Sequence, residues 1–581
     1  MMHSAPSNTP LPETQAAFNW PAWPWTALDR AWLQFLKSHQ AAPEPLHELL
    51  ALLVSYQMGR GHACLDLDAL WHKPSHLLDW TDVQIKALVH QAMSAKQDIV
   101  PDDLFAPAVN PWAEAAKTMP WAMGLHSPMV VSYQDNGQAQ RVYLRRAWQA
   151  EQSIQASMQI RLAKNFEVPH NSDDLLNQLF GLQNPQTDWQ RIACAKALRS
   201  GLTLITGGPG TGKTTTLLAA IERAVSGNQR VLVCAPSNAA VDLLVEKLVD
   251  RGIGTLRIGH PARVEEKILN QTLDAKIALH ESFRDLRKLR KETESYLQLA
   301  KQYKRNFGPE ERAQRKLLYQ EVSRIRELAE HLEDYIRTDV YQKTQVFAST
   351  LVGAGSHHLK GMVFDLVFID EAAQGLEAAT WIPILKARKV IFAGDHCQLP
   401  PTIKSIDAAR QGLSTTLFEK MIQRHPHAAQ MLQVQYRMPA TVMGFSNQQF
   451  YEGKLQAAQN TQTHAFSPDE PVMEWVDTAG AGYTDQVESE SLSTFNPEEA
   501  QFACQYLNDT VLRIGFGLFK ENGWTIGLIA PYSAQVRRLR HLIFETYAFP
   551  NLRAFADLIT IDTVDGFQGQ ERDLMLISLT R

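Results

Sequence analysis

The first third of the chain has apolar residues three and four positions apart, which is the spacing of amphipathic helices. Residues 46–59 show this spacing clearly. A polar hairpin is expected at 129–145, where two runs of apolar residues flank an Asp-Asn-Gly turn sequence. We therefore predict a flexible arm over residues 1–25 and a mainly helical domain over residues 26–183.

From about residue 184 the pattern changes to short apolar runs that alternate with amphipathic stretches. This alternation predicts a parallel β-sheet covered by helices. Two such α/β domains are expected, over residues 184–434 and 435–581, and the second ends soon after its last predicted strand. In the first domain, strands are predicted at 202–207, 230–236, 254–259, 345–350, 366–372 and 389–395. In the second, they are predicted at 471–477, 525–531, 558–565 and 574–580.

A long charged segment at about 262–343 interrupts the first α/β domain. Leucines recur on one stripe in both of its halves, and the Asn-Phe-Gly-Pro sequence at 306–309 separates the halves. A helical face that only meets solvent does not require such a stripe. The pattern therefore predicts two long helices that form an antiparallel coiled-coil stalk.

Composition narrows the class of protein. The 581 residues carry a net charge of −5, so binding to a phosphate backbone requires a local basic groove rather than a basic chain. The five cysteines are far apart, which argues against a zinc site or a disulfide framework and indicates a reducing compartment. Neither a signal peptide nor a membrane span is expected. Nine of the thirteen tryptophans precede residue 150, where core packing or stacking on nucleic-acid bases could explain them.

A glycine-rich segment at 207–214 follows one predicted strand and opens a predicted helix, which is the context of a phosphate-binding P-loop. Backbone N–H groups of such a loop surround phosphates, Lys213 reaches the outer phosphates and Thr214 ligates Mg²⁺. Asp370 and Glu371 end another strand, which we expect to neighbour the P-loop strand, so that Asp370 supports the metal and Glu371 orients the attacking water. Gln398 follows the next strand and is well placed to sense a γ-phosphate, and stabilisation of its own turn is the less favoured alternative.

Seven segments in order resemble the motifs of superfamily 1B helicases, in particular the branch of the nonsense-mediated-decay and immunoglobulin-mu-binding-protein helicases. The segments are GGPGTGKT, APSNAAVD, DEAAQ, GDHCQLPP, QYRM, APYSAQV and TVDGFQGQE. The resemblance implies two tandem RecA-like domains with the stalk inserted in the first. It also implies that ATP and Mg²⁺ bind between the domains and that single-stranded nucleic acid lies across them.

The resemblance also assigns roles to individual residues. Catalysis would rest on Lys213, Asp370, Glu371, Gln398 and Arg437, of which Arg437 is an arginine finger from the second domain. Thr214 and Asp370 would hold the metal. The remaining nucleotide contacts would come from Gln190, Gly207, Gly208, Pro209, Gly210, Thr211, Gly212, Thr215, Tyr436 and Glu571. The nucleic-acid backbone would contact Ser237, Asn238, Pro531 and Thr563. For Tyr436 and Pro531, a packing role is an alternative.

The N-terminal part is similar to RecD, the helicase subunit of the bacterial exonuclease V complex, at 59–67, at 142–154 and around the P-loop. Both resemblances imply movement from 5′ to 3′, and the RecD likeness favours DNA and a bacterial cytoplasm. The family continues to a further motif with a second arginine, and the spacing separates Arg581 from that motif, so we expect the last helicase motif to be missing.

Three functions are therefore open. The first is an ATP-dependent 5′-to-3′ DNA helicase in repair, recombination or defence. The second is an RNA helicase or ribonucleoprotein remodeller, and the third is an ATP-gated nucleic-acid-binding module with little hydrolysis. No carboxylate cluster in the sequence supports a metal-dependent nuclease, and protein partners are not indicated.

Overall fold

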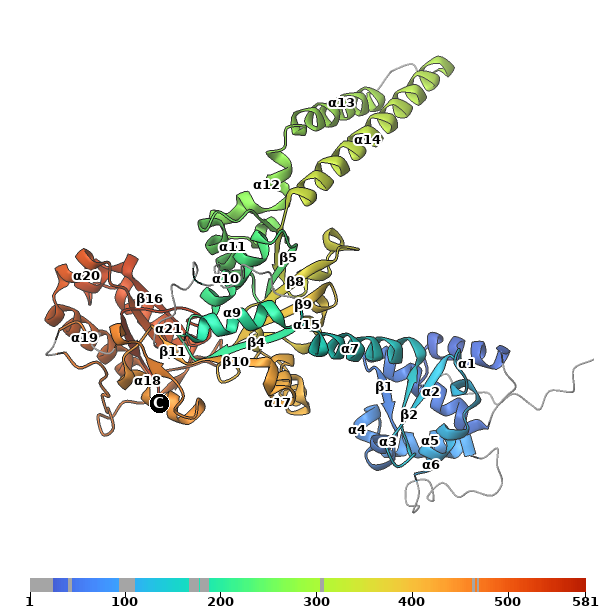
Figure 1. Cartoon of the computed structure of the whole chain (residues 1–581), viewed down its shortest axis with the longest axis horizontal. Coiled ribbons are helices and arrows are strands. Elements are labelled where there is room, and N and C mark those ends of the chain that lie inside the picture. Colours follow the sequence, from blue (N-terminus) through green and yellow to red (C-terminus); the bar gives the residue numbers. More distant parts are fainter. Residues whose placement is uncertain are drawn as a thin grey trace, which may run out of the picture. The chain divides into compact units, whose positions relative to one another are not determined.

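The chain divides into two units, Met1–Gln159 and Ile160–Arg581. The computed structural model describes residues 24–39, 44–93, 110–166, 177, 188–302, 308–461, 465–467 and 470–581 (Figure 1). Most of the predicted arm, residues 1–23, lies outside the described residues. No described helix combines the length and the apolar character that a membrane span needs. The domain boundaries expected from the sequence stay predictions.

The N-terminal unit is mainly helical, as predicted, and also contains a small antiparallel sheet. Its helices are α1 (Ala27–His39), α2 (Pro45–Gly59), α3 (Leu67–His72), α4 (Pro74–Leu78), α5 (Asp82–Met93), α6 (Pro111–Thr118) and α7 (Arg145–Ala163), the last of which runs into the second unit. The predicted hairpin is confirmed by β2 (Met129–Tyr133) and β3 (Ala139–Leu144). A third strand that the sequence did not predict, β1 (Cys64–Asp66), pairs with β3.

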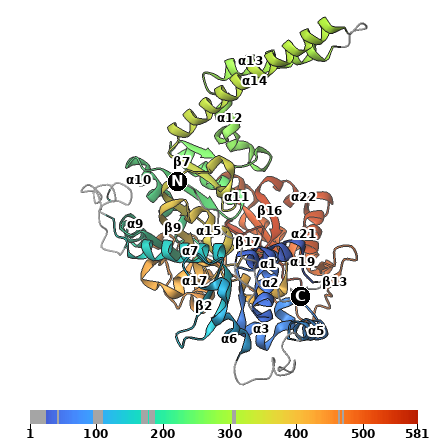
Figure 2. The ribbon, with the colours of Figure 1, turned by 90° about the vertical axis from the view of Figure 1, so that its right-hand side faces the viewer.

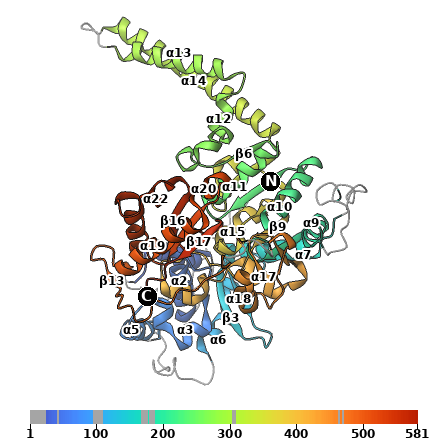
Figure 3. The same cartoon turned by 90° about the vertical axis from the view of Figure 1, so that its left-hand side faces the viewer.

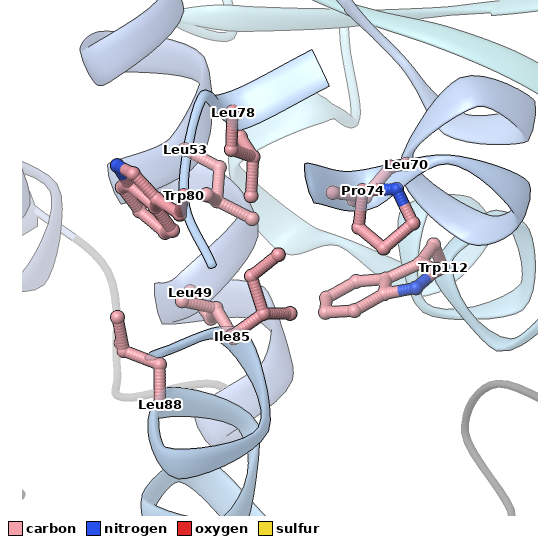
Figure 4. Close-up of a pocket in the computed structure, with 9 residues that line it drawn as sticks. All are labelled: Leu49, Leu53, Leu70, Pro74, Leu78, Trp80, Ile85, Leu88 and Trp112. Carbon is pink, nitrogen blue, oxygen red and sulfur yellow. The ribbon is translucent and has the colours of Figure 1, made fainter. Parts of the chain in front are cut away.

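Tryptophans of the N-terminal unit take part in its core. Trp112 and Trp121 are 1% and 2% exposed, and helix α2 contributes a buried apolar run to the same cluster. Figure 4 shows Trp80 and Trp112 on either side of a small apolar gap, together with Leu49, Leu53 and Ile85. A gap of about 10 Å³ is close to the size of one water, so it is a packing defect rather than a ligand pocket. For these tryptophans, packing is therefore the better of the two interpretations.

A seven-stranded parallel sheet forms the centre of the second unit, in the order β10-β4-β9-β8-β5-β7-β6. Its strands are β4 (Leu202–Gly207), β5 (Val231–Ala235), β6 (Thr255–Arg257), β7 (Val346–Thr350), β8 (Phe364–Ile369), β9 (Ala387–Gly394) and β10 (Ala429–Leu432). Every residue of β4 and β5 is buried, as expected for strands covered on both faces. All six strands predicted in this part are confirmed, and β10 adds a seventh.

Helices connect these strands and cover the sheet. They are α9 (Trp189–Arg199), α10 (Lys213–Ser226), α11 (Asn238–Asp250), α12 (Leu273–Ala278), α15 (Glu377–Ile384), α16 (Ile406–Ala408) and α17 (Leu417–Arg424). Helices α10 and α11 bury Leu217, Ile221, Leu244 and Leu248 in the core that they share with β5 and β8. The α/β alternation in the sequence therefore predicts this layered arrangement correctly.

The stalk consists of α13 (Phe283–Lys301) and α14 (Pro309–Lys343), which are inserted between β6 and β7. Figures 1 and 2 show the two helices side by side, extending from the sheet. Arg290 pairs with Glu333 at 2.5 Å, and Arg315 Nε donates to the carbonyl of Ala300 at 2.7 Å, so the helices run antiparallel. The predicted coiled coil is confirmed. Of its turn, residues 303–307 lie outside the described part of the chain.

A three-stranded parallel sheet, in the order β16-β15-β17, forms the centre of the C-terminal part. Its strands are β15 (Ile526–Ala530), β16 (Ile559–Thr563) and β17 (Leu574–Ile577). Around them lie α19 (Pro497–Ile514), α20 (Phe516–Asn522), α21 (Ser533–Arg540) and α22 (Pro550–Arg553), which share one apolar core with the sheet. Figure 3 shows α19, α20 and α22 around β16 and β17. Smaller elements precede it: β11 (Val434–Gln435), α18 (Ala440–Phe450), β12 (Gln456–Ala457), β13 (Gln486–Val487) and β14 (Thr494–Phe495).

The strand predicted at 471–477 is wrong, because this stretch is irregular. Val472, Met473 and Trp475 are 40%, 56% and 74% exposed, so these apolar residues are not covered by a sheet. The other three strands predicted in the C-terminal part are confirmed.

A buried ion pair joins α11 to β6. Asp242 Oδ1 accepts from Arg257 Nε at 2.7 Å, and the two side chains are 2% and 1% exposed. The guanidinium also donates to Asn238 Oδ1 at 2.9 Å and to the carbonyl of Ile258 at 2.7 Å. Asp242 Oδ2 accepts from the backbone N–H of Glu265 at 3.0 Å. The pair thus ties a helix, a strand and the start of the insertion together.

Replacing Asp242 by alanine (Asp242→Ala) leaves the buried Arg257 charge without its carboxylate. We expect the free energy of unfolding to fall by about 3–5 kcal/mol, measured by urea denaturation of the full chain followed by circular dichroism. Glu222→Ala is the matched control, because Glu222 pairs with Arg251 at 3.2 Å with side chains 40% and 34% exposed. Such a pair contributes at most about 1 kcal/mol. Equal, small losses in the two variants would contradict the structural role of Asp242.

Candidate functional site

The glycine-rich loop joins the carboxyl end of β4 to the start of α10 at Lys213. At Gly210 and Gly212 the backbone has φ of 72° and 77°, a region that favours glycine. A Cβ on Gly212 would lie 2.1 Å from Gln190 Nε2, so the Gln190 side chain would have to move if Gly212 were replaced. The loop contains Gly208, Pro209, Gly210, Thr211 and Gly212, and α10 begins with Lys213, Thr214 and Thr215. This geometry turns backbone N–H groups and a helix N-terminus toward one point, as phosphate binding requires.

Lys213 is the first residue of α10, and its side chain is 12% exposed. Its ammonium donates to the carbonyls of Gly207 at 2.7 Å and Gly208 at 3.0 Å, and it lies 3.9 Å from Asp395 Oδ2. Burial lowers the pKa of Lys213, and the nearby carboxylates, Asp395 first, oppose that shift. The ammonium is therefore held at the loop by carbonyls and a carboxylate.

Asp370 and Thr214 lie together, although the strand order expected from the sequence is wrong. Asp370 follows β8, and β9 separates β8 from β4, so the two strands are not neighbours. Thr214 Oγ1 nevertheless donates to Asp370 Oδ2 at 3.2 Å, because the loop carries the chain from the end of β4 to the start of α10 near β8. The sequence gives only the order of the strands along the chain, and the order of the strands in the sheet differs from it because β9 lies between β4 and β8.

The Asp370 carboxylate fits a divalent-cation site. Burial, with a smaller contribution from the charge of Glu371, raises the pKa of Asp370 to about 6. A hydroxyl and a carboxylate supply the hard oxygen ligands that Mg²⁺ prefers. Glu371, the next residue, has φ of 50° and accepts from Gln374 Nε2 at 2.9 Å. The donor set thus matches the predicted metal site, and Glu371 lies directly beside it.

Asp395 is a site residue to which the sequence analysis assigned no role. It follows Gly394 at the end of β9 and is 2% exposed. Gln398 Nε2 donates to Asp395 Oδ2 at 2.7 Å, and the hydroxyl of Tyr451 donates to the same oxygen at 2.7 Å. The GDHCQ segment already pointed to this strand end, whereas no local pattern marks Tyr451, which lies 56 positions away along the chain.

Residues 434–458, which we call the β11–β12 segment, pack directly on the glycine-rich loop. The backbone N–H of Tyr436 donates to the carbonyl of Gly210 at 2.9 Å. A Cβ on Gly210 would lie 2.4 Å from Cβ of Arg437, and one on Gly208 would lie 2.5 Å from Leu455 Cδ1. The structure therefore brings the predicted arginine finger to the predicted phosphate loop.

The other predicted nucleotide contacts also gather at this point. Arg437 Nε donates to Glu571 Oε2 at 2.5 Å, so the predicted finger and the predicted ribose ligand form an ion pair. Gln190 Nε2 donates to the carbonyl of Thr211 at 3.1 Å. The side chain of Tyr436 is 53% exposed, and the structure does not bury it as a packing residue. The roles of these residues stay predictions.

The four residues predicted to contact nucleic acid fall into two pairs at carboxyl ends of strands. Ser237 and Asn238 follow β5, and both already have structural roles. Ser237 Oγ caps α11 by accepting from Ala240 N–H at 3.2 Å, and Asn238 accepts from Arg257. Pro531 is exposed after β15, whose residue Ala530 pairs with Thr563 at the end of β16. Sequence spacing alone did not reveal the cap and the bond to Arg257, which depend on the folded chain.

Comparison with known proteins gives the family of each part. An AAA domain model matches residues 185–406, and a second AAA domain model matches residues 413–581. The model of the N-terminal domain of RecD, a subunit of the RecBCD enzyme, matches residues 24–135.

Three similar proteins each match about seven tenths of this chain. DNA-binding protein SMUBP-2 of Mesocricetus auratus is 34% identical over 68% of this chain and 39% of its own length. The uncharacterized ATP-dependent helicase MJ0104 of Methanocaldococcus jannaschii is 32% identical over 68% of this chain and 63% of its own. A regulator of nonsense transcripts 1 homolog of Neurospora crassa is 31% identical over 73% of this chain and 36% of its own. The chain thus spans less than two thirds of the length of each relative.

Gly210→Ala tests the contact between the loop and the β11–β12 segment. The added methyl group meets Arg437, so we expect the rate of ATP hydrolysis to fall about a hundredfold through displacement of that side chain. Gly523→Ala is the matched control, because Gly523 has φ of 65° and open space around a Cβ. Both variants carry the backbone strain of about 1–2 kcal/mol, and only the first carries the clash. Equal hydrolysis by the two folded variants would refute the functional importance of the contact.

Proposed function

Residues 185–581 belong to the superfamily 1B helicases, and from that premise we propose that the chain is an ATP-dependent helicase or translocase. It moves 5′ to 3′ along single-stranded nucleic acid, and DNA is favoured over RNA. The observation that carries the proposal is the contact of Arg437 with the glycine-rich loop at Gly210. An arginine brought from a separate segment to a phosphate loop is the arrangement that phosphoryl transfer uses to stabilise its transition state.

The geometry supports a separate role for each residue around the proposed phosphate site. Lys213 and the loop N–H groups bind the phosphate oxygens, and Gln398 and Arg437 approach the γ-phosphate. Thr214 and Asp370 would hold Mg²⁺, which when bound supplies positive charge to the phosphate oxygens. Glu371 accepts the proton of the attacking water. Because the chemistry depends on positioned charge, losing one of these groups affects the rate more than the fold.

The rest of the nucleotide is bound by groups around the loop. Gln190, which already bonds to the loop at Thr211, reads the adenine, and the exposed Tyr436 ring stacks on it. Glu571 binds the ribose hydroxyls once its ion pair with Arg437 opens. These three roles rest on the family resemblance and on the proximity of the groups to the loop.

Single-stranded nucleic acid is proposed to cross the carboxyl ends of β5, β15 and β16, where Ser237, Asn238, Pro531 and Thr563 lie. Small polar groups there position a backbone without reading its sequence. The names of two relatives point to different nucleic acids. One is called a DNA-binding protein, and the other is called a regulator of nonsense transcripts. The RecD-like N-terminal region favours DNA, and RNA remodelling is the second candidate.

The proposal predicts that single-stranded DNA stimulates steady-state ATP hydrolysis by the full chain. Lys213→Ala and removal of Mg²⁺ should each abolish turnover, and Arg437→Ala should lower kcat by about three to five orders of magnitude. Lys360→Ala, at an exposed lysine, serves as the control and should leave turnover unchanged.

Three outcomes separate the candidates. Hydrolysis that RNA stimulates more strongly than a DNA of the same sequence supports the remodeller instead. ATP-dependent binding to single strands with negligible hydrolysis supports the gated binding module. Absence of both binding and hydrolysis contradicts all three functions.

A further inference from the structure

A buried carboxylate, Asp395, lies at the centre of the nucleotide site without belonging to the predicted set. Its Oδ2 accepts from Gln398 Nε2 and from the Tyr451 hydroxyl, each at 2.7 Å, and lies 3.9 Å from Lys213 Nζ. Its Oδ1 accepts from the backbone N–H of Cys397 at 3.1 Å. One carboxylate therefore contacts the phosphate-binding lysine, the γ-phosphate sensor and a distant tyrosine at the same time.

The carboxylate determines which way the Gln398 amide faces. An ionised carboxylate only accepts hydrogen bonds, so the amide nitrogen must turn toward Asp395. The amide oxygen, Oε1, is then the atom that Gln398 offers to its surroundings. An oxygen at this position would be able to accept a hydrogen bond from an attacking water or from a guanidinium, whereas a flipped amide would present N–H donors instead.

Tyr451 holds this arrangement from the opposite side. It follows α18 in the β11–β12 segment, is 7% exposed and packs with Met443 and Leu455. Burial, and next the charge of Asp395, raise the pKa of the Tyr451 hydroxyl above its ordinary value. The hydroxyl therefore keeps its proton and stays a donor throughout the physiological pH range.

The position of Tyr451 in the chain also matters. The β11–β12 segment carries Arg437, and its Leu455 side chain packs at Gly208 of the loop. The hydrogen bond to Asp395 is thus a polar link between the segment that supplies the finger and the strand end that supplies Gln398. Buried hydrogen bonds of this kind set a geometry, because breaking one leaves a polar group without a partner.

We propose that Tyr451 is a positioning residue for ATP hydrolysis. Through Asp395 it orients the Gln398 amide, and it fixes the position of the β11–β12 segment relative to the glycine-rich loop. This inference rests on the proposed function, since it concerns the rate of the same reaction. It adds a residue outside the predicted site, and it separates Tyr451 from the exposed Tyr436, whose expected partner is the adenine.

Tyr451→Phe tests the proposal, because it removes one oxygen and retains the ring in its apolar surroundings. We expect kcat for single-stranded-DNA-stimulated ATP hydrolysis to fall about tenfold, with KM for ATP and the melting temperature nearly unchanged. Tyr547→Phe is the matched control at a side chain that is 82% exposed, and it should behave like the unaltered chain.

A double-variant comparison separates positioning from a purely structural role. If Tyr451 acts through Gln398, Tyr451→Phe should lower kcat no further in a Gln398→Ala background. Asp395→Asn, which lets the amide of Gln398 turn, should lower kcat at least as much and should also remove the effect of Tyr451→Phe.

Each remaining outcome has a definite meaning. Unchanged kcat in Tyr451→Phe, additive losses in the double variant, or loss of folding overturns the positioning role while the proposed function stands. Absence of hydrolysis by the unaltered chain refutes the proposed function itself and this inference with it.

Discussion

The buried charge of Lys213 is the constraint on which the site depends. Removing an ammonium from water costs several kcal/mol unless carbonyls and carboxylates replace the lost hydration. Here the carbonyls of Gly207 and Gly208 and the carboxylate of Asp395 do so. The glycine-rich loop must therefore curl back on the lysine, and the end of β9 must lie next to the end of β4. The contacts that compensate the lysine charge therefore also fix the loop in the conformation that the proposed phosphate site requires.

The sequence predicts the features that neighbouring residues form, and it does not predict the contacts between residues far apart along the chain. The glycine-rich loop, the strands and the stalk are local patterns, and the structure confirms them apart from the strand at 471–477. That prediction fails because a short apolar run shows only that a sheet could accommodate it, and none of the described strands pairs with this stretch. The position of β9 between β4 and β8 and the bond from Tyr451 to Asp395 depend on sheet order and on packing 56 residues apart. No local pattern encodes either feature.

The APSNAAVD segment shows why a functional interpretation and a structural one can both hold for the same residues. Ser237 caps α11, Asn238 accepts from Arg257, and Asp242 neutralises Arg257 and binds the backbone at Glu265. Through these bonds the carboxyl end of β5 is fixed to β6 and to the start of the stalk insertion. A nucleic-acid backbone that contacted Ser237 or Asn238 would therefore meet side chains that are fixed to β6 and to the start of the stalk insertion. The structural bonds therefore give the proposed contacts a rigid base.

The ion pair of Arg437 with Glu571 lies at the surface of the site, where water weakens it. Its side chains are 31% and 67% exposed, and a pair so accessible to water contributes at most about 1 kcal/mol. A doubly charged phosphate group within reach of Arg437 outweighs one solvated carboxylate, so the pair holds the finger near the loop without binding it firmly. The bond of Tyr451 to Asp395 is different, because both partners are buried and no water can replace either. The exposed contact is therefore the one that can open during a reaction cycle, and the buried contact is the one that sets the geometry to which the finger returns.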